Sequence, residues 1–139
     1  MAKVSVRILL VDDYAPFRIL VASKLEKQPG LHVVGLAADG LEAVQQAEKL
    51  QPDLVLLDIG LSKLNGIEAA RQIRLVSPKS ILLFVSANSS LEIAREALST
   101  GARGYVMKVD VNGELLAAVN AVLMGEQFVS HRFSSDGFI

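Results

Sequence analysis

Short apolar runs, each bounded by polar or turn-forming residues, recur five times along the chain. Runs of this length predict β-strands, and a run without polar interruption is typical of a strand buried on both faces of a parallel sheet. The run between Asp53 and Asp58 is the clearest, because Pro52 precedes it and Gly60 follows it. The five predicted strands cover Val4–Val11, Leu31–Ala38, Leu54–Leu57, Ser80–Val85 and Arg103–Met107.

Apolar residues recur at helical spacing in the segment that follows each predicted strand. This period predicts amphipathic helices at residues 17–25, 41–50, 67–73, 91–98 and 115–123. Gly101 and Gly125 follow the last two of these segments, as expected at helix C-termini. Asp13 is a candidate cap for the first helix, and Asp110 or Asn112 for the fifth.

The alternation of strand and helix indicates an α/β protein with a doubly wound parallel sheet and helices on both faces, because parallel strands need crossover connections. Right-handed crossovers leave few topologies, and the flavodoxin-like order 2-1-3-4-5 is predicted for the five-stranded sheet. One domain is expected over residues 1–127. Residues 128–139 have no clear period and are predicted to be a C-terminal tail or the start of an interdomain linker, partly disordered after about Ser130.

Composition narrows the classes of function. The chain has 139 residues, a formal net charge of −1 and no cysteine. Thiolate chemistry, disulfides and cysteine-based metal sites are therefore excluded, and the near-neutral charge gives no electrostatic footprint for nucleic acid. No apolar run approaches the roughly 18 residues of a membrane span. A cytoplasmic protein with no membrane association is expected.

Polar residues follow the predicted strands at the points where those strands end. Asp12 and Asp13 follow the first strand, Asp58 the third, Ser86 the fourth and Lys108 the fifth. The predicted strand order brings all of them to one edge of the sheet, at the switch point where ligands bind. Three carboxylates close together repel one another unless a cation neutralises them, and carboxylate and carbonyl oxygens suit Mg²⁺. No histidine follows a predicted strand, so zinc is not expected.

A carboxylate beside Mg²⁺ can attack phosphorus and become an aspartyl phosphate. The metal and the Lys108 ammonium would offset charge on the phosphoryl oxygens, and the Ser86 hydroxyl and the Ala87 N–H would donate hydrogen bonds to them. Each residue taken singly has a simpler interpretation: the adjacent aspartates as helix caps, Ser86 as a turn residue and Lys108 as a solvated charge. Their joint occurrence at the strand ends favours a phosphoryl site.

The same residues carry a resemblance to a known family. Asp12-Asp13, Asp58, Ser86-Ala87 and the segment 104–108 resemble the response-regulator receiver domain of two-component signalling. The resemblance covers roughly residues 5–125. Each motif is weak by itself, whereas the ordered set is specific. The segments 39–43 and 101–105 are most similar to the NarL/FixJ subfamily.

The resemblance implies a chemical role for the acidic positions. Asp58 would be the phosphoacceptor and would take a phosphoryl group from the phosphohistidine of a sensor histidine kinase. Asp13 and Asp58 would bind Mg²⁺ directly, with Asp12 assisting through water. The Gly60 carbonyl would be a further metal ligand. Such a domain is a signalling switch that assists its own phosphoryl transfer and slow dephosphorylation, and it is not otherwise an enzyme.

The resemblance also implies which residues respond to the phosphoryl group. Ser86 would be the switch hydroxyl. Lys108 would pair with the phosphoryl group, which Ala87 would also bind. Tyr105 would be the switch aromatic, whose side chain swings inward from an outward rotamer. NarL/FixJ members usually pair the receiver with a C-terminal DNA-binding domain. Transcription would then be controlled, and DNA contacted, through an output domain that these residues do not include. The resemblance leaves homodimer formation open.

Two positions depart from the family pattern. Ser62 stands where proline is frequent, so the loop after Asp58 is expected to be looser. Val109 stands where many receivers have proline after the lysine. A cis peptide without proline costs about 2.5–4 kcal/mol, so a trans Lys108–Val109 bond is predicted.

Two other functions stay open at this point. One is a phosphohydrolase with an aspartyl nucleophile; such enzymes usually carry the nucleophile after the first strand and a second aspartate two residues later, whereas Asp12 and Asp13 are adjacent. The other is a degenerate receiver that serves only as a binding module. The intact acidic set and Lys108 argue against a degenerate site.

Overall fold

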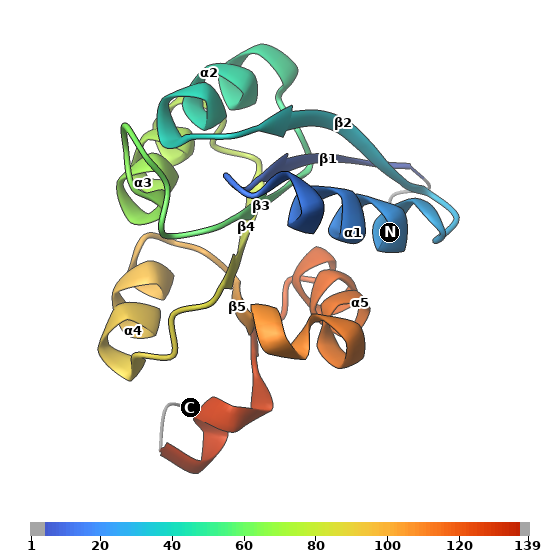
Figure 1. Ribbon diagram of the computed structural model, residues 1–139. Helices are drawn as coiled ribbons and strands as arrows, with labels where there is room; N and C mark the ends of the chain where they lie inside the picture. The colour runs from blue at the N-terminus through green and yellow to red at the C-terminus, as the bar shows by residue number, and fades with distance from the viewer. Residues whose placement is uncertain (1–4, 137–139) are drawn as a thin grey trace.

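The computed structural model describes residues 5–136. It confirms the predicted alternation of strand and helix (Figure 1). In chain order the elements are β1 (Val6–Val11), α1 (Ala15–Glu26), β2 (Leu31–Ala37), α2 (Gly40–Leu50), β3 (Leu54–Leu57), α3 (Gly66–Val76), β4 (Ile81–Ser86), α4 (Leu91–Ser99), β5 (Gly104–Met107), η1 (Lys108–Asp110), α5 (Val111–Leu123), β6 (Phe128–Val129) and η2 (His131–Asp136).

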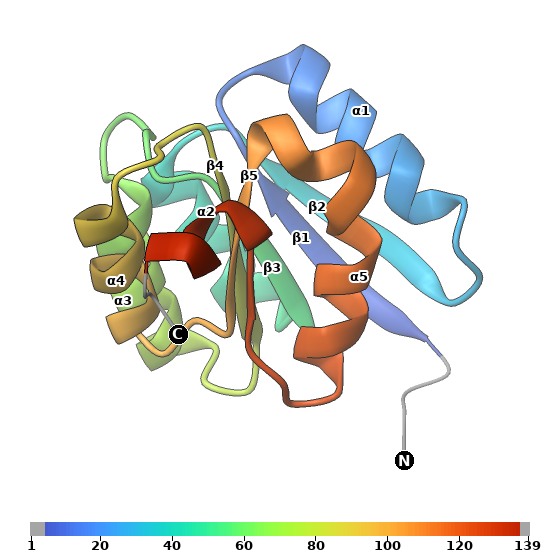
Figure 2. The same cartoon turned by 90° about the horizontal axis from the view of Figure 1, so that it is seen from below.

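The strands form one parallel sheet in the order β2-β1-β3-β4-β5-β6. The predicted order 2-1-3-4-5 is therefore confirmed, but the predicted number of five strands is wrong. Two residues, Phe128 and Val129, add a sixth strand beside β5, with Gly104 paired to Phe128. Helices α1 and α5 cover one face of the sheet and α2, α3 and α4 cover the other (Figure 2).

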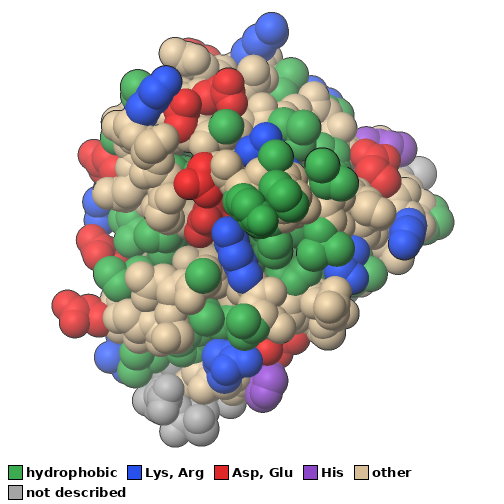
Figure 3. All heavy atoms as spheres, in the orientation of Figure 1, with side chains coloured by type: hydrophobic (Ala, Val, Ile, Leu, Met, Phe, Trp, Pro, Cys, Tyr) green, Lys and Arg blue, Asp and Glu red, His purple; other side chains and the backbone are tan. Residues whose placement is uncertain are grey.

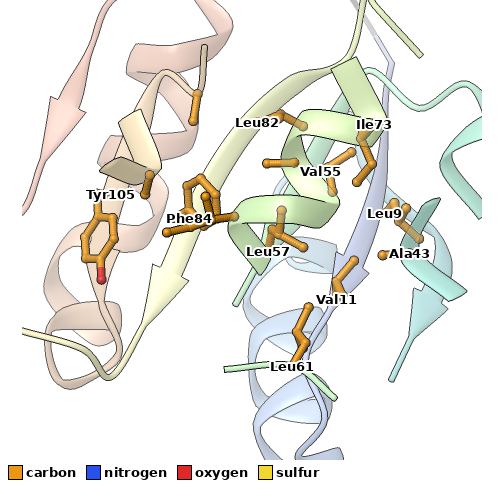
Figure 4. Close-up of a cluster of buried hydrophobic side chains, with 14 of the residues drawn as sticks. Leu9, Val11, Ala43, Val55, Leu57, Leu61, Ile73, Leu82, Phe84 and Tyr105 are labelled. Atoms are coloured by element: carbon orange, nitrogen blue, oxygen red, sulfur yellow. The ribbon is translucent and has the colours of Figure 1, made fainter. Parts of the chain in front are cut away.

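The central strand β3 explains the unbroken apolar run. Leu54 and Leu56 belong to the hydrophobic cluster beneath α1 and α5. Val55 and Leu57 belong to the cluster beneath α2, α3 and α4, where Val55 lies beside Ile73 of α3 (Figure 4). Successive side chains of a strand point to opposite faces, so a strand covered on both faces has no position for a polar residue.

The helix N-termini show which polar residues are used as caps. The side chains of Asp39, Asn65 and Ser90 accept backbone N–H groups at the starts of α2, α3 and α4. No side chain within the described residues caps the N-terminus of α1, so the prediction that Asp13 caps this helix is wrong. Asp110 lies at the N-cap position of α5, also without a described side-chain cap bond.

The segment after α5 is ordered where disorder was expected. Ser130 and Phe133 are buried, with 0% and 2% of their surfaces exposed. A parallel strand and a helical turn hold these residues against β5, so the predicted disorder after Ser130 is wrong as far as the structure describes the chain. Residues 137–139 lie outside the described residues. No helix within residues 5–136 combines the length and the apolar character that a membrane span requires.

Candidate functional site

The register of the two central strands brings two aspartates together. Val11 pairs with Leu57, so Asp12 and Asp58 directly follow paired residues on neighbouring strands. Both aspartates are buried, whereas Asp13 is exposed. Carboxylate oxygens of all three lie within 4.8 Å of one another. Acidic side chains lie against basic ones near the middle of the face shown in Figure 3, and a hydrophobic patch borders them.

Lys108 joins the two buried carboxylates. Its Nζ lies 2.7 Å from Oδ2 of Asp12 and 3.0 Å from Oδ2 of Asp58. Burial by itself would lower the pKa of the Lys108 ammonium, but the hydrogen bonds and charges of the two aspartates outweigh burial and leave that pKa above its ordinary value. The ring of Phe17 on α1 lies 4.6 Å from Nζ, close enough for a cation–π contact.

The loop after β3 fixes the second oxygen of Asp58. The Ile59 N–H donates a 2.7 Å hydrogen bond to Asp58 Oδ1, and the Gly66 N–H donates one of 2.7 Å to the Ile59 carbonyl. A Cβ at position 66 would lie 1.9 Å from the Asp58 carbonyl oxygen, so only glycine allows α3 to start this close to the site. At Gly60 a Cβ would meet no described atom within 4 Å, so the loop is open on that side.

A pocket of about 350 Å³ lies between the loops that follow β3 and β4. Its lining consists of Asp58, Ile59, Gly60, Ser86, Ala87 and Asn88. The structure thus brings Asp58, Ser86 and Ala87 together around one pocket, and Lys108 contacts Asp58 beside it. The Oγ of Ser86 accepts the Asn88 N–H at 3.0 Å.

Tyr105 is fully buried in this structure. Its hydroxyl donates a 2.8 Å hydrogen bond to the Asn88 carbonyl, and its ring packs against those of Phe84 and Phe133. Burial, and less strongly the charge of Asp58, raise the pKa of the Tyr105 phenol. The expected outward rotamer is therefore not found: the side chain is fully buried and its ring packs edge to face against Phe133.

The residues present fit a magnesium ion. Asp12, Asp13 and Asp58 offer only oxygen donors, and hard divalent cations prefer such donors. Gly60 lines the same pocket, and the role of its carbonyl as a metal ligand stays a prediction. Lys108 already offsets part of the charge of Asp12 and Asp58, whereas the exposed Asp13 carboxylate would gain from a cation.

Sequence reasoning missed several residues that shape the site. Phe17 contacts Lys108, and the guanidinium of Arg18 donates a 2.5 Å hydrogen bond to the Asp12 carbonyl. Both lie in the first turns of α1, where the helical period alone marks Phe17 as a core position. Ser130 and Phe133 reach β5 from the C-terminal segment. The apolar pair Phe128-Val129 after Gly125 was a sequence signal for the short strand that brings them there. The Lys108–Val109 bond is trans, as are all peptide bonds among the described residues.

A comparison of the sequence with known protein families identifies a family for this chain. Residues 8–120 match the model of the response regulator receiver domain. The chain belongs to this family. The family predicted from the strand-end residues is therefore confirmed, while the role of each site residue stays a prediction.

Relatives of this receiver domain have different whole-protein functions. A protein-glutamate methylesterase/protein-glutamine glutaminase of Alkalilimnicola ehrlichii is 42% identical over 79% of this chain and 29% of its own length. The transcriptional regulatory protein LiaR of Bacillus subtilis is 36% identical over 87% of this chain and 57% of its own length. The chain thus spans less than two thirds of both relatives. The receiver domain of NarL from Mycobacterium tuberculosis is 30% identical with a TM-score of 0.83, over 89% of this chain and 100% of that one.

Proposed function

We propose that this receiver domain is a phosphorylation-dependent signalling switch, in which Asp58 accepts a phosphoryl group from the phosphohistidine of a sensor histidine kinase. The observation that best supports this proposal is the position of the Asp58 carboxylate. Lys108 and the Ile59 N–H each hold one of its oxygens, and the carboxylate lines an open pocket with Ser86. A buried carboxylate in this arrangement is oriented and neutralised on one side and accessible on the other.

The proposed transfer forms one bond and breaks one. A carboxylate oxygen of Asp58 attacks phosphorus, the P–N bond of the phosphohistidine breaks, and the imidazole leaves with the electron pair. Lys108, whose raised pKa keeps it protonated at neutral pH, remains next to the developing charge. The Ser86 hydroxyl and the Ala87 N–H are the donors proposed for the phosphoryl oxygens. When bound through Asp13, Asp58 and the Gly60 carbonyl, with Asp12 assisting, Mg²⁺ would add positive charge at these oxygens.

The output of the switch is proposed to be control of transcription in the cytoplasm. The likeness to LiaR, a transcriptional regulatory protein, and to the NarL receiver supports this direction. The methylesterase relative shows that similar receivers also occur with other activities. Contact with DNA is proposed to come from an output domain, because the near-neutral charge of this chain gives no basic footprint.

The test is phosphoryl uptake measured by intact mass. The protein is incubated with Mg²⁺ and acetyl phosphate or phosphoramidate, and one phosphoryl adduct is expected. Asp58→Asn should take up none, because an amide is a poor nucleophile. The matched control is Asp53→Asn, at the opposite end of β3, where Asp53 Oδ2 accepts the Arg7 N–H at 2.8 Å and an amide oxygen can do the same.

Each outcome of this experiment favours a different one of the competing functions. A persistent adduct in the wild type and in Asp53→Asn, but not in Asp58→Asn, supports the switch. Rapid consumption of the phosphodonor without an adduct would favour the phosphohydrolase. No reaction at all would favour a degenerate binding module, and equal adducts in Asp58→Asn and the wild type would exclude Asp58 as the acceptor.

A further inference from the structure

Residues 128–133, here called the C-terminal strap, lie along the free edge of β5. The N–H of Phe128 donates to the Arg103 carbonyl at 3.0 Å, and the N–H of Ser130 donates to the Tyr105 carbonyl at 3.0 Å. The Ser130 hydroxyl in turn accepts the Met107 N–H at 2.9 Å. The strap therefore satisfies backbone groups of β5 that an edge strand would otherwise expose.

Side chains of the strap add three anchors. The Phe133 ring meets the Tyr105 ring edge to face, with centroids 5.7 Å apart. Arg132 holds both carboxylate oxygens of Asp110, at 2.7 and 2.8 Å. His131 Nδ1 lies 2.6 Å from Oε2 of Glu114 on α5. The strap runs into the helical turn η2, which lies between α4 and α5 in Figure 2.

A continuous series of contacts connects the strap to the phosphoryl pocket. Ser86 lines the pocket and its Oγ accepts the Asn88 N–H. The Asn88 carbonyl accepts the Tyr105 hydroxyl. The Tyr105 ring, which lies beside Phe84 in Figure 4, is covered on another side by Phe133. The proposed phosphoryl donor Ser86 is thus connected to the strap through Tyr105, whose phenol also interacts with the Ser86 side chain.

We infer that the C-terminal strap is a gate coupled to the phosphoryl site, and that occupancy of this site loosens the strap. The inference rests on the proposed phosphorylation of Asp58. A phosphoryl group would draw the Ser86 hydroxyl and the loop after β4 toward itself. The Asn88 carbonyl moves with this loop, and Tyr105 follows its hydrogen-bond acceptor away from Phe133. The strap then loses the edge-to-face contact between Phe133 and Tyr105 and is held by its backbone hydrogen bonds and its polar contacts with Asp110 and Glu114.

Loosening the strap would uncover a defined surface. That surface consists of the β5 edge, the Tyr105 ring and the carboxylates of Asp110 and Glu114, all of which the strap now engages. In the unphosphorylated protein the chain's own residues 128–133 are the occupant of this surface. A signal at Asp58 is thereby converted into access to an edge strand and its acidic border.

Thermodynamic linkage makes the coupling measurable in both directions. If a phosphoryl mimic loosens the strap by some factor, opening the strap must tighten binding of the mimic by the same factor. Phe133→Ala should therefore raise the affinity for beryllofluoride by about fivefold or more, within the usual range of coupling between sites. Arg132→Gln, which removes the bidentate ion pair with Asp110 but leaves the Phe133 ring in place, should raise this affinity in the same direction by less. Lys27→Gln, at the exposed end of α1, is the matched loss of a positive charge and should change nothing.

The direct experiment is amide hydrogen exchange by NMR on the full chain with Mg²⁺, with and without beryllofluoride. Shifts of the Ala87 and Gly60 amides report occupancy of the pocket. Exchange of the Ser130 and Met107 amides reports the strap, since the partners of both bonds lie across the β5–strap junction. Protection of these two amides is expected to fall about fivefold or more on occupancy, while amides between β1 and β2 stay unchanged.

The two failures are distinguishable. If the pocket amides do not respond to beryllofluoride, the proposed function fails at its binding step and the gate fails with it. If the pocket amides respond while protection of the Ser130 and Met107 amides stays equal or rises, the pocket binds the phosphoryl mimic as proposed and the gate is wrong. Unchanged affinity in both Phe133→Ala and Arg132→Gln, with both variants folded, would likewise overturn the coupling.

Discussion

The hydroxyl of Tyr105 donates a 2.8 Å hydrogen bond to the backbone carbonyl of Asn88. This bond ties a fully buried side chain of β5 to the loop that follows β4. The N–H of Asn88 binds Ser86 Oγ, so one loop residue contacts both the pocket hydroxyl and the aromatic ring. The loop can therefore transmit a change at the pocket to β5 without a large movement of the sheet.

The first prediction concerns this transmission. Ser86→Ala should still take up a phosphoryl group on Asp58, but the ring resonances of Tyr105 should shift much less on addition of beryllofluoride than in the wild type. The reason is that the hydroxyl through which the phosphoryl group would pull the loop is missing. Ser89→Ala, an exposed hydroxyl of the same loop, is the matched control and should behave as the wild type. A full Tyr105 shift in Ser86→Ala would show that the loop is moved by another group.

The second prediction concerns the close approach of α3 to the acceptor loop. Gly66→Ala should destabilise the fold by about 1–3 kcal/mol, because the new Cβ would collide with the Asp58 carbonyl oxygen. It should also slow phosphoryl uptake, since the loop must shift. Gly113→Ala in α5 is the control: its Cβ would meet open space, and replacing a helical glycine should stabilise by about 0.5–1 kcal/mol. Urea unfolding checks both; equal midpoints for the two variants would contradict the steric argument.

The sequence predicted the sheet well because hydrophobic burial determines it. The apolar run of β3 serves two clusters at once, and only a strand covered on both faces requires such a run. The carboxyl ends of parallel strands meet at one edge, so the positions of Asp12, Asp58 and Lys108 followed from the strand order.

The sequence did not predict contacts that depend on tertiary packing. Phe133 is a single aromatic residue without a periodic neighbour, and its burial depends on the position of the Tyr105 ring. Arg132 and Asp110 lie 22 residues apart and carry no local signal of their pairing. Asp13 has the residue type of a helix cap but does not serve as one, because a cap also requires a backbone geometry that residue types do not reveal.

The third prediction concerns the metal. Phosphoryl uptake should require Mg²⁺ and stop when a chelator removes it. Asp13→Asn should need a higher Mg²⁺ concentration for half-maximal uptake, because it replaces an exposed anionic ligand without disturbing the Lys108 contacts. Asp39→Asn is the control, since asparagine caps a helix as well as aspartate does. An unchanged Mg²⁺ requirement in Asp13→Asn would remove Asp13 from the ligand set.

The fourth prediction concerns alkaline pH. The chain has two tyrosines and no tryptophan, so in a Tyr14→Phe background the ultraviolet absorbance of phenolate reports Tyr105 alone. Burial raises the Tyr105 pKa, so its midpoint should lie above the ordinary value of about 10. Phe133→Ala, which uncovers the ring, should move this midpoint back toward that value. A midpoint that Phe133→Ala leaves unchanged would show that the strap does not cause the burial.

The raised pKa of Tyr105 also determines whether the stability of the fold rises or falls with pH. The folded state holds the Tyr105 proton more tightly than the unfolded state does, so the stabilisation is fully present below the ordinary phenol pKa of about 10 and is lost as pH rises through the folded pKa. Lys108, whose pKa is also raised, acts in the same direction. The free energy of unfolding should therefore fall with rising alkaline pH, and less steeply in Tyr105→Phe, where Lys108 alone of this pair remains. Urea unfolding of both proteins between pH values of about 8 and 11 measures the two slopes, and an equal slope in Tyr105→Phe would mean that its phenol proton is not linked to folding.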